Sequence, residues 1–315
     1  MRINPFPLKR WQTLVFKITA SKLYAAIAVV TFIVGSVAVY YSINLLLGSL
    51  DQTGAENLQS VRASQWSGYM AASDIQNRSS VVSSVSASWT VPEVALSENN
   101  TFSGVWVGIG GYGEETLIQA GTEQECVDGR LTYYAWYEML PDYLIRIPNF
   151  RVRAGDTIAI SISLINENTS SWSIEITDVT RSEYFKKNVF YNSSMLSAEW
   201  IVERPKVNGT ISTLADFGNV TFTECTATIA GITGTIGNFS HAQLVMYEDK
   251  GTALVSVSPL NDDDSGFTVS YLESQSATTP PNDLPIQKFT TNLSHAFSVD
   301  TKAVFFKNLP KLSGA

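Results

Sequence analysis

The sequence predicts an all-β protein: an antiparallel β-sandwich preceded by one N-terminal transmembrane helix. Three observations support this fold class. Short stretches in which apolar and polar residues alternate follow one another from about residue 66 onward, without a segment that has the 3.6-residue period of a helix. Turn-forming residues separate these stretches. Residues 23–50 form a run of 28 residues without a charged side chain.

The uncharged run at 23–50 is long enough to cross a membrane, because a helix needs about 20 apolar residues to span the hydrocarbon core. A cleaved signal peptide has a shorter apolar region, of roughly 7–15 residues, and a small-residue cleavage site that this run lacks. Residues 1–22 carry five basic and no acidic side chains, which favours a cytoplasmic N-terminus. The sequence therefore predicts a single-pass signal anchor in the cell membrane, with the C-terminal domain extracellular.

After the anchor, residues 51–63 are polar and are expected to form a short stalk. Residues 64–272 contain closely spaced strands without intervening helices, which favours an antiparallel sandwich over a parallel α/β sheet. The clearest alternating runs are 83–91, 103–109, 131–138, 157–165, 171–179 and 227–236.

The strand pattern ends in a stretch of Ser, Thr and Pro, ESQSATTPPNDLP at 273–285. This composition is typical of a linker. We therefore assign residues 273–315 to a linker and a C-terminal tail, and we assign the tail no function.

The charge of the chain is unevenly distributed. The net charge of the whole chain is −8, with +5 in residues 1–50 and therefore −13 in the remainder. An acidic body of this kind is not expected to bind nucleic acid. We expect a monomer.

Standard catalytic and metal-binding motifs are absent. The sequence has no P-loop, no G-x-S-x-G and no H-E-x-x-H. Its two histidines, His241 and His295, are isolated. The acidic stretch 261–266 (NDDDSG) is interpreted as a hairpin tip rather than a cation site. We therefore expect neither a metal nor a cofactor.

The two cysteines, Cys126 and Cys225, lie 99 residues apart in the predicted extracellular domain. An oxidising location favours a disulfide between them. A loop of that length would stabilise the fold by up to about 4–5 kcal/mol in the chain-entropy model. The alternative is two buried free thiols.

Eight of the 18 asparagines lie in N-x-S/T sequons, which suggests an exported and glycosylated surface. They are Asn77, Asn99, Asn168, Asn192, Asn208, Asn219, Asn238 and Asn292.

Eight short motifs follow one another along residues 64–272. They are Trp66-x-Gly68, SASWTVP (86–92), WVGI (106–109), LIQAG (117–121), AWYE with a following proline (within 134–141), GDxI (155–158), AEWIVE (198–203) and FxxVxFTEC (217–225). In this order they resemble the glutamic peptidase family, the eqolisins, which are acid endopeptidases. The resemblance implies a concanavalin- or glucanase-like sandwich and, with the anchor, a membrane-anchored member of that family.

The resemblance implies a catalytic pair made of a glutamine and a glutamate. By motif these are Gln119 of LIQAG and Glu203, the last residue of AEWIVE. Because side chains alternate along a strand, Glu199 and Glu203 share one face. The resemblance selects Glu203 of the two.

The implied chemistry is acid–base hydrolysis of peptide bonds. An unperturbed glutamate titrates near about 4.3, so it can donate and accept protons in acid. A glutamine amide does not titrate there, and it can position a water or donate to the developing oxyanion. The sequence therefore predicts an acid-acting endopeptidase with polypeptide substrates.

Further residues of the substrate cleft follow from the same motifs. Aromatic residues and glycines on a concave sheet suit an extended peptide, although ordinary sandwich core is the alternative interpretation. The implied substrate-binding residues are Trp66, Gly68, Trp106, Gly111, Gly121, Trp136 and Glu138. The sequence departs from the family at Gly110 and Tyr134, where members usually have Asp.

Two other classes of function remain open from the sequence. A carbohydrate-binding sandwich would display Trp and Tyr but would not require Gln119 together with Glu203. A glycosidase would in addition need two carboxyls facing each other across a groove. A structural cell-surface protein would have no cleft and would bury Trp106 and Trp136 away from solvent.

Overall fold

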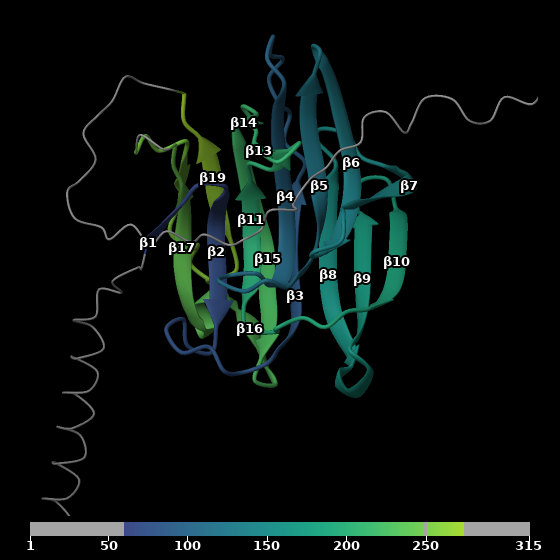
Figure 1. The fold of residues 1–315 in the computed structure, drawn as a ribbon, viewed down its shortest axis with the longest axis vertical. Helices are drawn as coiled ribbons and strands as arrows, with labels where there is room; N and C mark the ends of the chain where they lie inside the picture. The colour runs from purple at the N-terminus through teal and green to yellow at the C-terminus, as the bar shows by residue number, and fades with distance from the viewer. Residues whose placement is uncertain (1–59, 249–250, 274–315) are drawn as a thin grey trace, which may run out of the picture. The chain divides into compact units, whose positions relative to one another are not determined.

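The computed structural model describes residues 60–248 and 251–273, and within them the protein is an all-β sandwich. Two sheets stack face to face, as Figure 1 shows. Apart from the strands, the described residues contain two 3₁₀ turns, η1 (Glu167–Thr169) and η2 (Ile236–Asn238). The predicted all-β sandwich is confirmed.

The first sheet, called sheet A here, carries the strands of most of the predicted motifs. Its order is β1 (Ser60–Ala63), β17 (Ser240–Met246), β2 (Trp66–Ala72), β11 (Ala198–Glu203), β4 (Thr101–Gly110), β5 (Leu117–Val127), β6 (Arg130–Met139) and β7 (Ile145–Arg151). Neighbours are antiparallel except β1 with β17, and β14 (Thr213–Leu214) adds a second parallel pairing, with β4.

The second sheet, sheet B, forms the opposite layer. Its order is β10 (Glu183–Phe190), β9 (Ser171–Asp178), β8 (Thr157–Asn166), β3 (Val82–Thr90), β15 (Asn219–Ile229), β19 (Phe267–Tyr271) and β18 (Val255–Val257), with β16 (Ile232–Thr235) paired to β15. A separate two-stranded hairpin joins β12 (Lys206–Val207) to β13 (Thr210–Ile211).

The alternating run predicted at 227–236 is two strands rather than one. β15 ends at Ile229, and β16 begins at Ile232 and pairs back onto it. Ala230 and Gly231 between them both have positive φ, 52° and 78°. Two such residues form the tight turn that fits the twist of a hairpin, so the apolar run folds on itself.

Large aromatic side chains fill the core between the sheets. Trp89 of β3 and Trp200 of β11 are buried, and each indole N–H has a partner: Thr122 Oγ1 at 3.1 Å for Trp89, and the Ser86 carbonyl at 2.9 Å for Trp200. Buried indoles that keep a hydrogen bond add large apolar area without leaving a polar atom unpaired. Both hydrogen bonds join one sheet to the other across the core.

The predicted disulfide is wrong: both cysteines are buried free thiols. Cys126 lies on β5 of sheet A, and its Sγ lies 3.5 Å from the Ser97 carbonyl. Cys225 lies on β15 of sheet B, where its Sγ is nearest to the Thr223 carbonyl, at 3.9 Å. Each thiol is therefore packed against its own local backbone and not against the other.

The predicted transmembrane helix at 23–50 and the tail beyond 273 lie outside the described residues. Within the part of the chain that the structure describes, no helix is long and apolar enough to span a bilayer.

Candidate active site

The face of sheet A that points away from sheet B, called the outward face here, carries the candidate site. Strand pairing sets its side chains in rows. One row crosses β11, β4, β5 and β6 through Glu203, Gly104, Glu123 and Tyr134. We call it the first row.

Two further rows follow at two-residue steps, because side chains alternate between the faces of a strand. The second row contains Ile201, Trp106, Gly121 and Trp136, and the third contains Glu199, Gly108, Gln119 and Glu138. The predicted pair Gln119 and Glu203 therefore shares one face but occupies different rows.

Two of the predicted cleft glycines allow the strands to approach closely. A Cβ at Gly121 would lie 2.3 Å from the Val105 carbonyl oxygen, and one at Gly68 would lie 2.0 Å from the Trp200 carbonyl oxygen. Gly68 also has a φ of 138°, which favours glycine. Both positions thus exclude a side chain, and the second row is formed without strain.

Glu203 is buried, with 4% of its surface exposed, and its carboxyl is hydrogen-bonded. The Trp106 indole donates to Glu203 Oε2 at 2.8 Å. Trp66 packs edge-on against Trp106, with ring centroids 5.0 Å apart. Burial raises the pKa of Glu203 to about 7, and hydrogen bonds from Trp106 and Trp66 and the charge of Lys206 oppose that rise. Glu203 is therefore mostly protonated at pH values well below 7.

Gln119 is oriented by Glu138. Its Nε2 donates to Glu138 Oε2 at 2.6 Å, and both side chains are buried. Gln119 Oε1 has no hydrogen-bond partner. Burial, followed by the field of Glu203, raises the pKa of Glu138 to about 8. Glu138 thus contacts Gln119 directly and interacts electrostatically with Glu203, while no hydrogen bond joins Gln119 to Glu203 among the described residues.

The two positions that depart from the family are accommodated locally. Gly110 has a φ of 86°, and a Cβ there would lie 2.7 Å from the Thr116 carbonyl oxygen, so an Asp side chain would not fit without a shift. Tyr134 is buried, and its hydroxyl donates to Glu125 Oε1 at 2.7 Å. The Arg146 guanidinium lies over the Tyr134 ring, 4.3 Å from its centroid.

The remaining predicted cleft residues are placed as follows. Trp66 pairs with Glu203 and Gly68 with Ile201, so both extend the rows onto β2. Gly111 lies on the loop after β4, outside the rows. Trp106 and Trp136 are fully buried, as the structural alternative expects. However, they lie on the outward face beside the carboxyls and not in the core between the sheets.

Sequence reasoning did not assign two acids of this face. Glu123 lies four residues after Gln119 on β5, and Glu199 lies four before Glu203 on β11, so each shares the outward face. Burial raises the pKa of both carboxyls well above the usual range. The spacing of four already placed Glu199 on the face of Glu203, and the same spacing from Gln119 is the signal in the sequence that could have identified Glu123.

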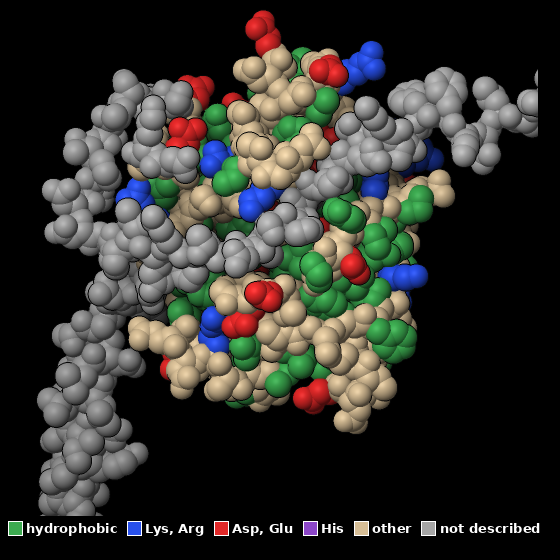
Figure 2. All heavy atoms as spheres, viewed as in Figure 1, with side chains coloured by type: hydrophobic (Ala, Val, Ile, Leu, Met, Phe, Trp, Pro, Cys, Tyr) green, Lys and Arg blue, Asp and Glu red, His purple; other side chains and the backbone are tan. Residues whose placement is uncertain are grey.

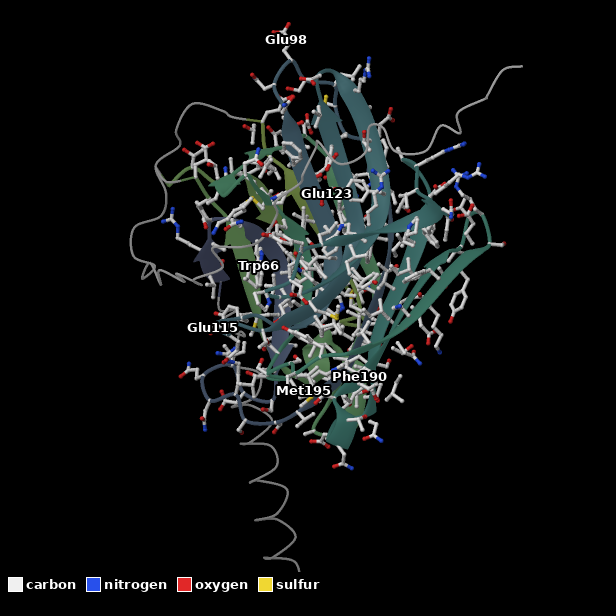
Figure 3. All side chains as sticks on the ribbon, turned by 45° about the vertical axis from the view of Figure 1, so that its right-hand side comes forward. Trp66, Glu98, Glu115, Glu123, Phe190 and Met195 are labelled. Atoms are coloured by element: carbon white, nitrogen blue, oxygen red, sulfur yellow. The ribbon has the colours of Figure 1, made fainter. Side chains whose placement is uncertain are left out.

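The acids of the site are not part of a charged surface. Figure 2 shows acidic and basic side chains scattered among hydrophobic and uncharged ones on the visible face. In Figure 3, Glu98 lies at the top of the sandwich and Glu115 at its left edge, whereas Glu123 lies within the body of the sandwich. Among residues 60–248 and 251–273, no group of three or more His, Cys, Asp or Glu side chains could hold a metal ion.

Comparison with known proteins places this geometry in a family. A sequence profile described as the peptidase A4 family matches residues 64–271. Aspergillopepsin-2 of Aspergillus niger is 34% identical over 170 residues, which are 53% of this chain and 58% of that protein. The match thus spans little more than half the length of this relative.

Solved structures show the same fold. Scytalido-glutamic peptidase with a transition state analog inhibitor superposes with a TM-score of 0.56 at 23% identity, over 66% of this chain and 98% of that one. SCP-B, a member of the eqolisin family of peptidases in complex with the tripeptide Ala-Ile-His, gives 0.53 at 22% identity over the same shares of the two chains.

Proposed function

Because the chain belongs to the peptidase A4 family, we propose that it is an acid-acting glutamic endopeptidase whose catalytic residues are Glu203 and Gln119. The family profile covers residues 64–271, which include both residues, and the resemblance seen in the motifs is thereby confirmed. The observation that carries the proposal is the placement of both side chains on one buried outward face, beside Trp106 and Glu138.

Glu203 acts as the acid and base. With a pKa of about 7, its carboxyl is protonated in acid. It donates that proton to the carbonyl oxygen of the substrate peptide as water adds to the carbonyl carbon, and the carboxylate left behind takes a proton from the water. The same carboxyl then protonates the leaving nitrogen and takes a proton from one hydroxyl of the tetrahedral diol, so its proton is regenerated.

Gln119 positions the reacting groups and does not exchange a proton with them. Its amide does not titrate, and Glu138 fixes its orientation through the 2.6 Å hydrogen bond. Oε1 is free to accept from the attacking water, and an amide N–H can donate to the oxygen on which charge develops. The substrate class that suits this chemistry is a polypeptide that approaches the rows beside Trp66, which is partly exposed, whereas Trp106 and Trp136 are buried.

The setting of the enzyme is proposed from the sequence. Residues 23–50 would anchor the chain in the cell membrane as a monomer, with the sandwich outside the cell. The seven sequon asparagines that lie within the described residues are all exposed, which is what glycosylation requires. They are Asn77, Asn99, Asn168, Asn192, Asn208, Asn219 and Asn238.

The function is tested by digesting a denatured protein with the purified chain between pH 2 and pH 6. The proposal expects cleavage that is fastest in acid and is unaffected by inhibitors of serine, cysteine and metallopeptidases. A folded chain that cleaves no peptide bond at any of these pH values would contradict it.

A further inference from the structure

The Glu123 carboxyl borders the space above Gly104, a glycine of the first row. A Cβ built on Gly104 would lie 3.0 Å from Glu123 Oε2, 3.8 Å from Trp106 Cδ1 and 3.9 Å from Trp136 Cζ2. Gly104 pairs with Glu203 on one side and with Glu123 on the other. The position above this glycine is therefore bordered by the Glu123 carboxyl and two indoles, and Glu203 is the residue paired with Gly104 on the neighbouring strand.

The Glu123 carboxyl is buried with an unused polar atom. The residue is 1% exposed, and its Oε2 has no hydrogen-bond partner. Buried polar atoms in native proteins almost always have a partner, so each exception requires an explanation. A carboxyl that served only to hold the strands together would be expected to have one.

The surroundings of Glu123 keep its proton in place. Burial is the largest cause of its raised pKa, and the fields of Glu125, Glu203 and Glu138 add to it in that order. Arg146 of β7 lies over the Tyr134 ring and acts on Glu125 and Tyr134, and Arg151 of the same strand pairs with Tyr134. The titratable and charged groups around Glu123 on this face are Glu125 on β5, Glu203 on β11, Tyr134 and Glu138 on β6, and Arg146 and Arg151 on β7.

We propose that Glu123 is a second acid of the active site, whose protonated carboxyl donates a hydrogen bond to the carbonyl oxygen of the peptide that is cleaved at Glu203. The inference rests on the proposed peptidase function. A substrate carbonyl above Gly104 would be within reach of both carboxyls, because Glu203 and Glu123 flank this glycine in one row. A carboxyl kept neutral by an apolar site can act as a donor to a developing oxyanion.

Glu125 provides the matched control. It lies two residues further along β5 on the same face, and its carboxyl already accepts the Tyr134 hydroxyl at 2.7 Å. Replacing Glu125 changes one nearby acid and leaves the Glu123 carboxyl, the proposed hydrogen-bond donor, in place. Glu125→Gln is therefore expected to leave kcat within about threefold of the wild-type value, as expected for a group outside the transition state.

The first test compares kcat and KM of the wild-type chain with Glu123→Gln and Glu123→Ala. The proposal expects Glu123→Ala to lower kcat by about 10²–10³, the usual effect of losing one oxyanion donor, with little change in KM. Glu123→Gln keeps a donor of the same size and is expected to stay within about tenfold of the wild type. Equal kcat for wild type and Glu123→Ala, or a Glu123→Gln variant as impaired as Glu123→Ala, would overturn the inference.

The second test does not depend on turnover. NMR of the chain labelled with ¹³C at the glutamate carboxyls should show a resonance, absent in Glu123→Gln, that stays at the protonated position at pH values where an ordinary glutamate has ionised. A resonance that titrates near the usual glutamate value would overturn the inference in an active enzyme. A folded wild-type chain that cleaves no substrate would overturn the peptidase function, and the catalytic role of Glu123 with it. Failure of the Glu123 inference alone would instead be seen in a chain that is an active peptidase.

Discussion

The outward faces of the two sheets differ in how they satisfy their polar side chains. On sheet B, hydroxyls pair across strands: Ser86 with Thr226 at 2.7 Å, and Ser84 with Thr228 at 2.8 Å. On sheet A, Glu123 and Glu138 are buried, and each has a carboxyl oxygen without a partner. Hydroxyl pairs are satisfied at any pH, whereas buried carboxyls are stable only while they hold a proton.

The difference between the two outward faces indicates which sheet carries the function. A sheet face that only needs to meet water can be covered with Ser and Thr, as sheet B is. Buried acids with perturbed pKa values oppose stability and are typical of functional sites. If this account is correct, changes on sheet A should affect catalysis and its pH dependence, and equivalent changes on sheet B should not.

The largest of the effects predicted here, apart from that of Glu203 itself, concerns Gln119. Gln119→Ala removes the group that would position water and donate to the oxyanion, so kcat is expected to fall by about 10²–10³. Gln124→Ala is the control, because Gln124 is buried on β5 with its side chain on the opposite face, where it donates to Thr122. An equal loss of kcat in both variants, measured by steady-state kinetics, would contradict the assignment of catalysis to the outward face of sheet A.

The second prediction concerns stability and pH. Glu123, Glu138, Glu199 and Glu203 all have pKa values raised above the ordinary glutamate value. Between about pH 4.5 and the folded pKa values, the folded chain binds more protons than the unfolded chain, so stability falls as pH rises.

Thermal unfolding should therefore show a Tm that is higher at pH 5 than at pH 8, by about 5 °C or more. Glu138→Gln, which removes one of these carboxyls, should make the dependence shallower. A Tm that increased from pH 5 to pH 8 would contradict the assignment of neutral buried acids to this face.

The third prediction concerns Trp106. Trp106→Phe removes the hydrogen bond to Glu203 that lowers its pKa. The pKa should therefore rise, and the high-pH limb of kcat/KM should move upward by roughly half to one pH unit, the equivalent of a hydrogen bond of about 1 kcal/mol. Trp200→Phe, which removes an equivalent bond to Ser86 on the core side, should lower stability without moving the limb.

The smallest predicted effect is on sheet B. Replacing Ser86 by Ala together with Thr226 by Val removes one cross-strand hydroxyl pair, worth about 0.2–1 kcal/mol. Tm should change by no more than about 4 °C, and kcat/KM should be unchanged between pH 3 and pH 6. A shift in the pH profile of this double variant would show that the two faces are not independent.

The alternation of residues was sufficient to predict most of the strands and that Glu199 and Glu203 share one face. It placed Glu199 and Glu203 together and indicated a sandwich, because a period of two depends only on local sequence. It did not reveal that Gln119 and Glu203 occupy different rows. That offset is set by the pairing of β5 and β11 with β4, which is a tertiary property.

The errors of the sequence analysis also concern features that tertiary structure, and not local sequence alone, determines. The disulfide between Cys126 and Cys225 was inferred from compartment and number, but the packing of each thiol is fixed by strands of different sheets. The run at 227–236 was inferred from alternation, but two residues with positive φ turn the chain back. The role suggested here for Glu123 required Gly104, and only the register shows that these two residues are neighbours.

The central claim is that Glu203, of all the buried acids on this face, performs the chemistry. The most direct test is the kcat/KM of Glu203→Gln beside that of Glu199→Gln, at pH 3 to pH 5. Both acids are fully buried or nearly so, lie on the same face of β11 and are four residues apart. The account predicts a loss of at least about 10²–10⁴ for Glu203→Gln and a value within about tenfold of the wild type for Glu199→Gln. Retained activity in Glu203→Gln, or an equal loss in both variants, would contradict it.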